Sequence, residues 1–552
     1  MVVVVACAPS ARSEVLSPGG EMVRTIREGE IHRFVVSLAR DQVAAVTVDQ
    51  RGADIAVTTF DPSGKSLGSV DGPGGWDGAE TIAIDAHDAG AYAIEVAPTP
   101  APGAPMFRVG WSGEYAIRVE VTSAAEFRDR AAKRIAAFWD GDRVAVDELV
   151  AWLRREGHAL AVDEPGNDSD LAAVDAIIGH ARVIGFGEAD HDIHEYLALR
   201  NRIFEHLVMH GDVIAYVGET GVPEAIAVDD YITSGSGDAR AVGGRAFSWG
   251  IETALPENVA LLEWLRAYNA HAARPVHFYG MDLAGGRGGV FTASRLALDA
   301  ALDYLRVAVP TTAARLGPQL APFTDTFDAV GDHRLSDAQH AARAVVIAEL
   351  VATFERERVA MIAASSLLAY ERAQRIAINA AQLDGYFRST RAQSSIDAPA
   401  DPTQGGARDA AMASNLAWVV DHEHGGRVFV FAHTAHLRRG PTRWMPTKIP
   451  PPTSAGQHAA ALFGDDYIVI GSLGGSARRD DDTFDALLAR AELPVVLFDL
   501  RRAPRIAHRP WHFREEWLAE YHLAPYWIFD PAECFDAMIY VDKNTPAVPP
   551  RR

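Results

Sequence analysis

The chain has 552 residues and a formal charge of −22, from 52 Lys and Arg against 74 Asp and Glu. One hydrophobic core rarely serves so long a chain, so we expect two domains or more. The acidic balance argues against nucleic acid or an anionic membrane surface as a partner, because both need clustered Lys and Arg. With only Cys7 and Cys534, the sequence also excludes a disulfide scaffold and a multi-cysteine zinc site.

Residues 1–15, MVVVVACAPSARSEV, contain a short apolar stretch that ends in Val5-Ala6-Cys7 and is followed by small and polar residues. This segment resembles the tail of a bacterial lipoprotein signal, with Cys7 as the lipidated residue. It has no basic leader, and the apolar stretch is shorter than the usual length of about 7–15 residues. Two interpretations stay open: a lipoprotein that is extracytoplasmic or anchored to a membrane through Cys7, or a cytoplasmic protein in which Cys7 is incidental.

Residues 16–123 alternate between apolar and polar side chains with a period of two, as in HRFVVSL, QVAAVTVDQ, ETIAIDA and GEYAIRVEV. Turn residues such as Asp61-Pro62-Ser63-Gly64 separate these runs, so the pattern predicts an all-β sandwich. The segment resembles accessory modules of the pre-peptidase C-terminal type, which implies targeting or binding and no catalysis. It contains a GxSxG match at Gly64–Gly68, but Ser66 follows a hairpin turn with no helix after it, so we do not expect a nucleophile there.

Residues 124–175 have helical periodicity and predict a helical linker region, and residues 176–552 predict an α/β domain. Apolar runs separated by helical stretches favour a mostly parallel sheet that is flanked by helices. Two long segments with a period near 3.6, 336–365 and 367–388, predict a helical hairpin inserted in this domain. The expected strands are 181–186, 212–218, 275–281, 427–432, 467–471 and 494–498.

Polar side chains directly follow four of these expected strands. Because the carboxyl ends of parallel strands meet at one edge of a sheet, we expect these side chains to converge there. Each one alone could simply cap the following helix. The residues are Glu188 and His191, Glu219, Asp282, and His433 with His436.

The stretch GEADHDIHEYLALRNRIFEHLV (187–208) resembles the signature of the erythromycin esterase family, a group that includes succinoglycan-biosynthesis-protein-like hydrolases. The resemblance continues through 219–238, 247–269, 276–283, 408–420, 428–440 and 535–549, which spans nearly all of the second domain. Asp190 and Asp192 depart from the usual Thr and Gly of the signature, and Thr434 departs from the usual Asn.

The resemblance implies a catalytic set made of His191, Glu188, Arg200, Glu219 and His433. It also suggests substrate contacts at His436, Asp282, Trp249 and His194. In this interpretation His191 is the general base on a water, and Glu188 or Glu219 orients its imidazole. Arg200 and His433 would position the water or stabilise the oxyanion. Arg200 lies nine positions after His191, about 180° around an unbroken helix, so we predict that His191 precedes the helix.

Some residues in these motifs have simpler interpretations. His206 and His210 are spaced i, i+4 and could form a ligand pair, but without an HExxH pattern we favour a solvated helix face. Asp409 and Asn415 can be explained by helix capping and packing. Cys534 lies among aromatic residues and is expected to be an inert buried thiol.

The leading hypothesis is a carboxylic ester hydrolase that cleaves a small-molecule ester, such as a macrolide lactone in antibiotic resistance, without a cofactor or a covalent nucleophile. A second hypothesis makes the same cluster a divalent-metal hydrolase of another ester, amide or phosphoester, because His and carboxylate ligands suit Zn, Mn or Fe. A third is a non-catalytic surface binding protein. The natural substrate and the oligomeric state do not follow from the sequence.

Overall fold

The computed structural model of the chain describes residues 13–27, 29–70, 77–98, 112–163, 168–235, 237–247, 254–287, 290–291, 293–332, 334–393, 406–444, 452–474, 483–513 and 527–547. Cys7 and Trp249 therefore lie outside the described residues, and the expectations for them stay predictions. In the part of the chain that is described, no helix combines the length and apolarity required to cross a membrane.

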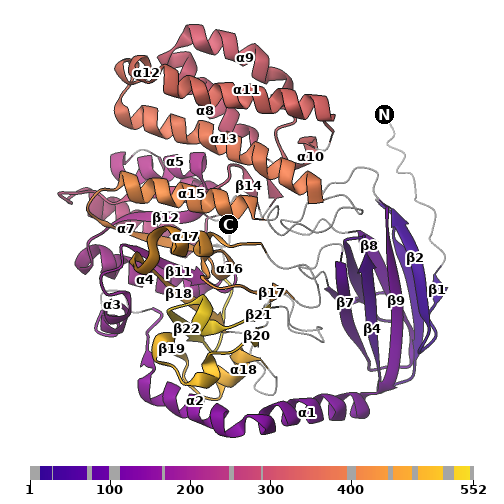
Figure 1. Cartoon of the computed structure of the whole chain (residues 1–552). Helices are drawn as coiled ribbons and strands as arrows, with labels where there is room; N and C mark the ends of the chain where they lie inside the picture. The colour runs from indigo at the N-terminus through magenta and orange to yellow at the C-terminus, as the bar shows by residue number, and fades with distance from the viewer. Residues whose placement is uncertain are drawn as a thin grey trace.

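The amino-terminal part is a β-sandwich of two sheets (Figure 1). The alternation expected from the sequence is present: in strand β3, Phe34, Val36 and Leu38 are buried while Arg33 and Ser37 are exposed. The first sheet has the order β1-β3-β8-β5-β6 and the second the order β2-β9-β4-β7. The strands are β1 (Glu14–Val15), β2 (Glu21–Arg27), β3 (His32–Leu38), β4 (Gln42–Arg51), β5 (Ile55–Phe60), β6 (Ser66–Val70), β7 (Asp77–Ala86), β8 (Gly90–Pro98) and β9 (Ser112–Ser123).

The carboxyl-terminal part is an α/β unit around an eight-stranded sheet of order β10-β19-β22-β18-β11-β16-β12-β13. The six strands from β22 to β13 pair in parallel, whereas β19 and β10 are antiparallel to their neighbours. The strands are β10 (His158–Ala159), β11 (Val183–Glu188), β12 (Val213–Gly221), β13 (His277–Asp282), β16 (Arg427–His433), β18 (Tyr467–Gly474), β19 (Val495–Asp499) and β22 (Ala537–Val541).

Strand β19 follows α18 (Phe484–Ala489), a helix of six residues. The run 494–498 is a strand as expected from the sequence, but one that runs antiparallel to its neighbour β22.

Helices cover both faces of this sheet. In β16, Val428 and Val430 pack on one face with α2 and α15, while Phe429 and Phe431 pack on the other face with α3, α4 and α7. The helices nearest the sheet are α2 (Arg143–Glu156), α3 (Ala172–Ile178), α4 (His194–His210), α5 (Val222–Ser234), α6 (Ala239–Ala246), α7 (Pro256–Asn269), α15 (Ala407–His422), α16 (Thr434–Leu437), α17 (Ala455–Phe463) and α19 (Pro531–Cys534).

A group of helices is inserted between β13 and α15 and has a core of its own. The helical hairpin expected at 336–365 and 367–388 corresponds to α11, α12 and α13, with a break at Glu357 between the first two. The inserted helices are α8 (Arg295–Ala308), α9 (Pro310–Thr324), α10 (Ala329–Asp332), α11 (Asp337–Arg356), α12 (Arg358–Ala364) and α13 (Leu367–Gln393). Figure 1 shows them stacked at one end of the α/β unit.

The segment expected as a helical linker contributes to the α/β unit. Helix α1 (Ala124–Gly141) begins at the N-cap Ser123, whose side chain accepts from the Glu126 backbone. Buried residues of α2, such as Leu149 and Leu153, belong to the core on one sheet face, and β10 pairs with the edge strand β19. The remaining short strands are β14 (Gly286–Arg287), β15 (Val290–Phe291), β17 (Arg443–Trp444), β20 (Trp511–Phe513) and β21 (Trp527–Phe529).

Candidate active site

The turn after β11 holds a histidine against a buried carboxylate. Nδ1 of His191 lies 2.7 Å from Oε1 of Glu188, whose side chain is only 6% exposed. His191 lies before α4, which begins at His194, as expected. The turn needs an unusual backbone, since Asp192 has a φ of 59° and its carbonyl accepts from Ala547. The His191 ring is 36% exposed, so it remains accessible from the surface.

The electrostatics of this pair favour a charged His191. Burial alone lowers the pKa of an imidazole, but the carboxylates of Glu188 and Glu219 outweigh that effect and raise the pKa of His191 to about 9. The Glu188 carboxyl has a raised pKa because of its burial, although His191 opposes this shift. Near neutral pH His191 is therefore an imidazolium, and its Nδ1 proton lies in the hydrogen bond to the Glu188 carboxylate.

His433 faces His191 and is fixed by backbone groups. The centroids of the two imidazole rings are 5.2 Å apart. Nε2 of His433 lies 2.9 Å from the carbonyl of Ala189, and its Nδ1 accepts from the N–H of Ala435 at 3.1 Å. A carbonyl requires a donor and an N–H requires an acceptor, so these contacts specify a neutral ring with the proton on Nε2. Burial and the positive charge of His191 accordingly lower the pKa of His433 to about 3.

Glu219, at the end of β12, joins three parts of the chain. Its Oε2 accepts from the backbone N–H of His433 at 2.7 Å, and its Oε1 accepts from Nη2 of Arg408 at 2.9 Å. Arg408 also donates through Nε and Nη2 to the two carboxylate oxygens of Asp282, at 3.0 and 2.7 Å. Glu219 and Asp282 are each 4% exposed. Although burial opposes it, the cations around Glu219 hold its pKa well below the usual range.

His436 completes this network with a second carboxylate. Its Nδ1 lies 2.8 Å from Oδ1 of Asp409, and its Nε2 lies 3.3 Å from Oε1 of Glu219. Asp409 in addition accepts from the backbone N–H of Ala455 at 2.8 Å. Burial disfavours the imidazolium, but the charges of Asp409 and Glu219 prevail and raise the pKa of His436 to about 10. His436 is therefore a cation at neutral pH.

A small cavity of about 20 Å³ lies beside these groups and has room for about one water molecule. Its lining includes Glu188, Asp192, Arg200 and Glu219. Oε2 of Glu188 is buried without a hydrogen-bond partner among the described residues, and a buried carboxylate oxygen normally requires a donor. A water in this cavity would supply that donor next to the His191 pair.

The sequence profile described as "Erythromycin esterase" matches residues 212–544, well over half of the chain. The chain belongs to the erythromycin esterase family. The matched residues begin at β12, so Glu188 and His191 precede them. The structure nevertheless includes β11 in the middle of the same sheet, between β16 and β18.

Individual relatives agree with this assignment. "Erythromycin esterase type II" from Escherichia coli is 23% identical over 340 residues, which is 58% of this chain and 75% of the relative. A Bacillus cereus protein of known structure has a TM-score of 0.61 at 20% identity, over 74% of this chain and 99% of its own. A mutant of the erythromycin esterase EreC in its open conformation gives a TM-score of 0.52 at 17% identity, over 69% of this chain and 95% of EreC. At these identities the two structures show a shared fold.

Arg200, which was expected in the catalytic set, lies at the cavity beside the cluster and packs against two aromatic rings. Arg200 lines the cavity and is 1% exposed, with its guanidinium 4.8 Å from the Phe247 ring centroid and 4.9 Å from that of Phe431. It donates to Oδ1 of Asn201 at 3.0 and 2.7 Å.

The imidazole of His194 is turned toward a different part of the unit. Its nitrogens lie 2.6 Å from Glu257 and 3.0 Å from Asp163, so its contacts are with the start of α7 and the segment before α3. The structure therefore does not bring His194 into the cluster around Glu188 and Glu219. Trp249, the other expected substrate contact, lies outside the described residues.

Sequence reasoning missed Arg408 and undervalued Asp409. From the sequence, helix capping and packing explain Asp409 as readily as a role in the site, but the N-cap of α15 is Gly406, and the carboxylate of Asp409 contacts His436 and Ala455. The available signal was the Arg-Asp pair that opens the matched segment 408–420. In such a pair the guanidinium can bind a carboxylate of the site, and the neighbouring carboxylate can bind a histidine of the same site.

Proposed function

We propose that the protein hydrolyses a carboxylic ester with a water activated at His191, without a covalent enzyme intermediate. A macrolide lactone is the first substrate to test. The family supports an esterase-type hydrolase, and the bond between Nδ1 of His191 and Glu188, at 2.7 Å, carries the proposal. A carboxylate that holds one imidazole nitrogen orients the ring and stabilises its cation when the other nitrogen takes a proton.

The proposed reaction transfers one proton through Nε2 of His191, because Nδ1 is held by Glu188. Water attacks the ester carbonyl as its proton moves to Nε2. The tetrahedral intermediate then collapses, the carbon–oxygen bond to the alcohol breaks, and Nε2 returns the proton to the leaving alkoxide. The products are a carboxylic acid and an alcohol, which for a lactone form one molecule that is one water heavier.

The pKa of His191 sets the condition for this chemistry. A pKa of about 9 leaves roughly one molecule in a hundred with a neutral His191 at pH 7. The neutral form is scarce but is an effective general base, because general bases become more effective as their pKa rises. We therefore expect activity that increases toward alkaline pH.

The other site residues have supporting roles in this proposal. Both nitrogens of His433 are used by backbone groups, so we assign it the positioning of the His191 ring rather than contact with the water. Arg408 and His436 are cations next to Glu219, and both nitrogens of His436 are held by Asp409 and Glu219, so we assign these two residues the charge balance of the site. Asp282 fixes Arg408 in place.

The alternatives have less support from the same residues. Ser66 lies on the exposed side of β6 in the sandwich and has no helix after it, which is unlike a nucleophile elbow. Among the described residues, Arg408 and His436 already pair with Glu219 and would compete with a metal ion for its oxygens. A pure binding protein would have little reason to bury so many charges, because apolar residues of similar volume would fold at lower cost.

Incubation with macrolides and other bulky esters, followed by mass spectrometry, tests the proposal. We expect a product heavier by one water, lost in His191→Ala and retained in His271→Ala, whose histidine is exposed on a turn. Runs with and without a chelator separate this mechanism from a metal-dependent one. Full activity of His191→Ala on a substrate that the parent protein cleaves would refute the mechanism.

A further inference from the structure

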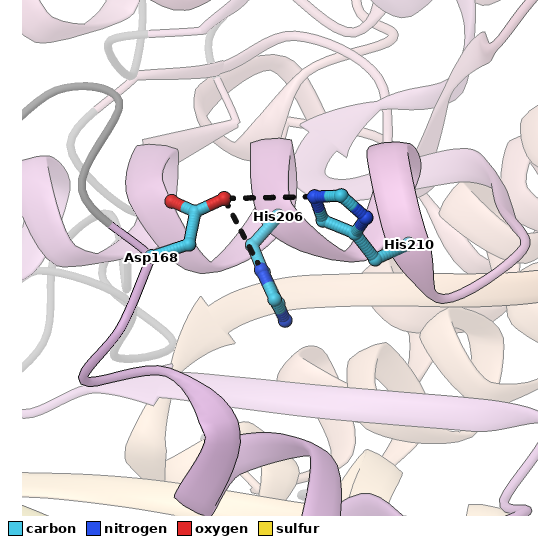
Figure 2. A group of neighbouring side chains, drawn as sticks. All are labelled: Asp168, His206 and His210. Carbon is cyan, nitrogen blue, oxygen red and sulfur yellow. Dashed lines mark hydrogen bonds and ion pairs between the residues drawn. The ribbon is translucent and has the colours of Figure 1, made fainter.

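A second cluster of ligand-type side chains lies toward the other end of α4 from His191. His206 and His210 are one helical turn apart near the end of that helix, about 18 and 24 Å along the axis from its first residue. Figure 2 shows both imidazoles directed at the carboxylate of Asp168, which precedes α3. Oδ2 of Asp168 is 3.3 Å from Nδ1 of His206 and 3.8 Å from Nε2 of His210. The solvated face that we expected is only half correct, because His206 is 7% exposed.

His206 is enclosed by two carboxylates. Its Nε2 lies 3.0 Å from both oxygens of Asp175, while its Nδ1 faces Asp168. A neutral imidazole has one N–H, so a ring that donates to Asp175 presents a lone pair to the oxygen of Asp168. Two lone pairs facing each other at 3.3 Å repel, and either a second proton on the ring or a metal ion bound by both groups removes the repulsion.

The surroundings of this cluster are rich in negative charge. One turn earlier in α4, Arg202 donates two hydrogen bonds of 3.1 and 2.8 Å to Asp170, so Asp170 already compensates its positive charge. A cation at the histidines would face the carboxylates of Asp168 and Asp175.

We propose that Asp168, His206 and His210 bind a divalent transition-metal ion of the Zn²⁺ type. The three ligand atoms lie within 4.8 Å of one another. Ligands of tetrahedral zinc, with bonds of about 2.0–2.1 Å, are roughly 3.3 Å apart, which is close to the separations from Asp168. His210 is 58% exposed and can complete the approach by a side-chain rotation.

The structure also provides the outer partner that metal-bound histidines usually have. Asp175 accepts from Nε2 of His206, which fixes the tautomer that presents Nδ1 to the metal. Three protein ligands leave a fourth position for water. Two nitrogens and one oxygen select Zn²⁺ or Co²⁺ over Ca²⁺ and Mg²⁺, which prefer oxygen ligands. The site would clamp the end of α4 to the segment that leads into α3.

Calorimetric titration tests the proposal with the full chain, without an affinity tag and after treatment with a chelator. We expect ZnCl₂ to bind at one equivalent, CaCl₂ not to bind, and Co²⁺ to give the absorption bands of a tetrahedral complex. His210→Ala and Asp168→Asn should each weaken Zn²⁺ binding at least tenfold. Both residues are at least partly exposed, so the variants should fold.

Two controls locate the site. His271→Ala, an exposed histidine elsewhere, should retain the affinity for Zn²⁺, and so should His191→Ala, which alters the proposed catalytic pair. Zn²⁺ binding that is unchanged in His210→Ala, or lost in His191→Ala, would overturn the assignment. The absence of any binding at micromolar Zn²⁺ would show that the cluster is an ion pair only.

Discussion

Glu188 and His433 are register partners at the carboxyl ends of the adjacent parallel strands β11 and β16. Neighbouring strands are about 4.8 Å apart, so this pairing brings the turn after β11 against the turn after β16. Gly187 permits the approach, since a Cβ there would lie 2.9 Å from Cα of Thr434. The contact between the His191 and His433 rings follows from this register, and several predictions concern it.

The rate of ester hydrolysis should increase with pH. Because the pKa of His191 is raised to about 9, its neutral fraction grows about tenfold per pH unit between pH 6 and 8. We expect kcat/KM to follow that slope and to level off near pH 9. A profile that is flat over this range, measured on any ester that the protein cleaves, would argue against His191 as the base.

Glu188→Gln should remove the charge that supports His191 while keeping its shape, since the amide oxygen can still accept from Nδ1. We expect a loss of about 10²–10⁴-fold in kcat. The inflection of the pH profile should also move to lower pH, because the main carboxylate that raises the pKa of His191 is lost. Glu263→Gln, on the exposed side of α7, is the matched control and should change neither quantity. A purely structural role for Glu188 would reduce activity without moving the inflection.

Arg408→Met should destabilise the α/β unit by about 3–5 kcal/mol, because it leaves the buried carboxylates of Glu219 and Asp282 without their shared cation. Arg295→Met is the control, since Arg295 pairs with carboxylates at the surface, where such a pair contributes little to stability. Denaturant unfolding of both variants measures the difference. Equal effects would mean that Arg408 does not carry the charge balance of the site.

Stability should fall as the pH rises from 7 to above 10. The pKa of His436 is raised from 6.5 to about 10, so its contribution is complete below pH 6.5 and is lost as the pH passes through 10. His191, with a pKa of about 9, adds to the same decline. Thermal midpoints across this range should fall less steeply in Asp409→Asn, in which the pKa of His436 is less raised. An identical slope in that variant would contradict this origin.

Much of the sheet could be predicted from the sequence, because parallel strands in an α/β unit are continuous apolar runs. Val183, Ile184 and Phe186 are all fully buried, which is why their run was visible without any alternation. The strand β22 was not recognised, although AMIYV is just as buried, because its five residues follow a short helix and have no clear boundary. The direction of β19 could not be predicted, because a buried antiparallel strand has the same continuous apolar run as a parallel one.

Only the site residues that lie at the end of a strand or directly after it could be predicted from the sequence. Glu188, Glu219, Asp282 and His433 end or follow strands, and their convergence follows from parallel pairing. Arg408 opens a helix 126 positions after Asp282, and only the folded chain brings their side chains together. The charge state of His191 was equally hidden, since it depends on how closely Glu188 and Glu219 approach it.

The carboxyl-terminal side of the helical insertion between β13 and α15 returns to Asp282, the last residue of β13. The side chain of Asn379 donates to the Asp282 carbonyl, and Arg408, just past the insertion, binds the Asp282 carboxylate. A change in the length of such an inserted segment costs little free energy, since doubling the length of a loop costs only about 0.6 kcal/mol in closure entropy. The insertion can therefore differ in length while Arg408 and Asp282 stay paired.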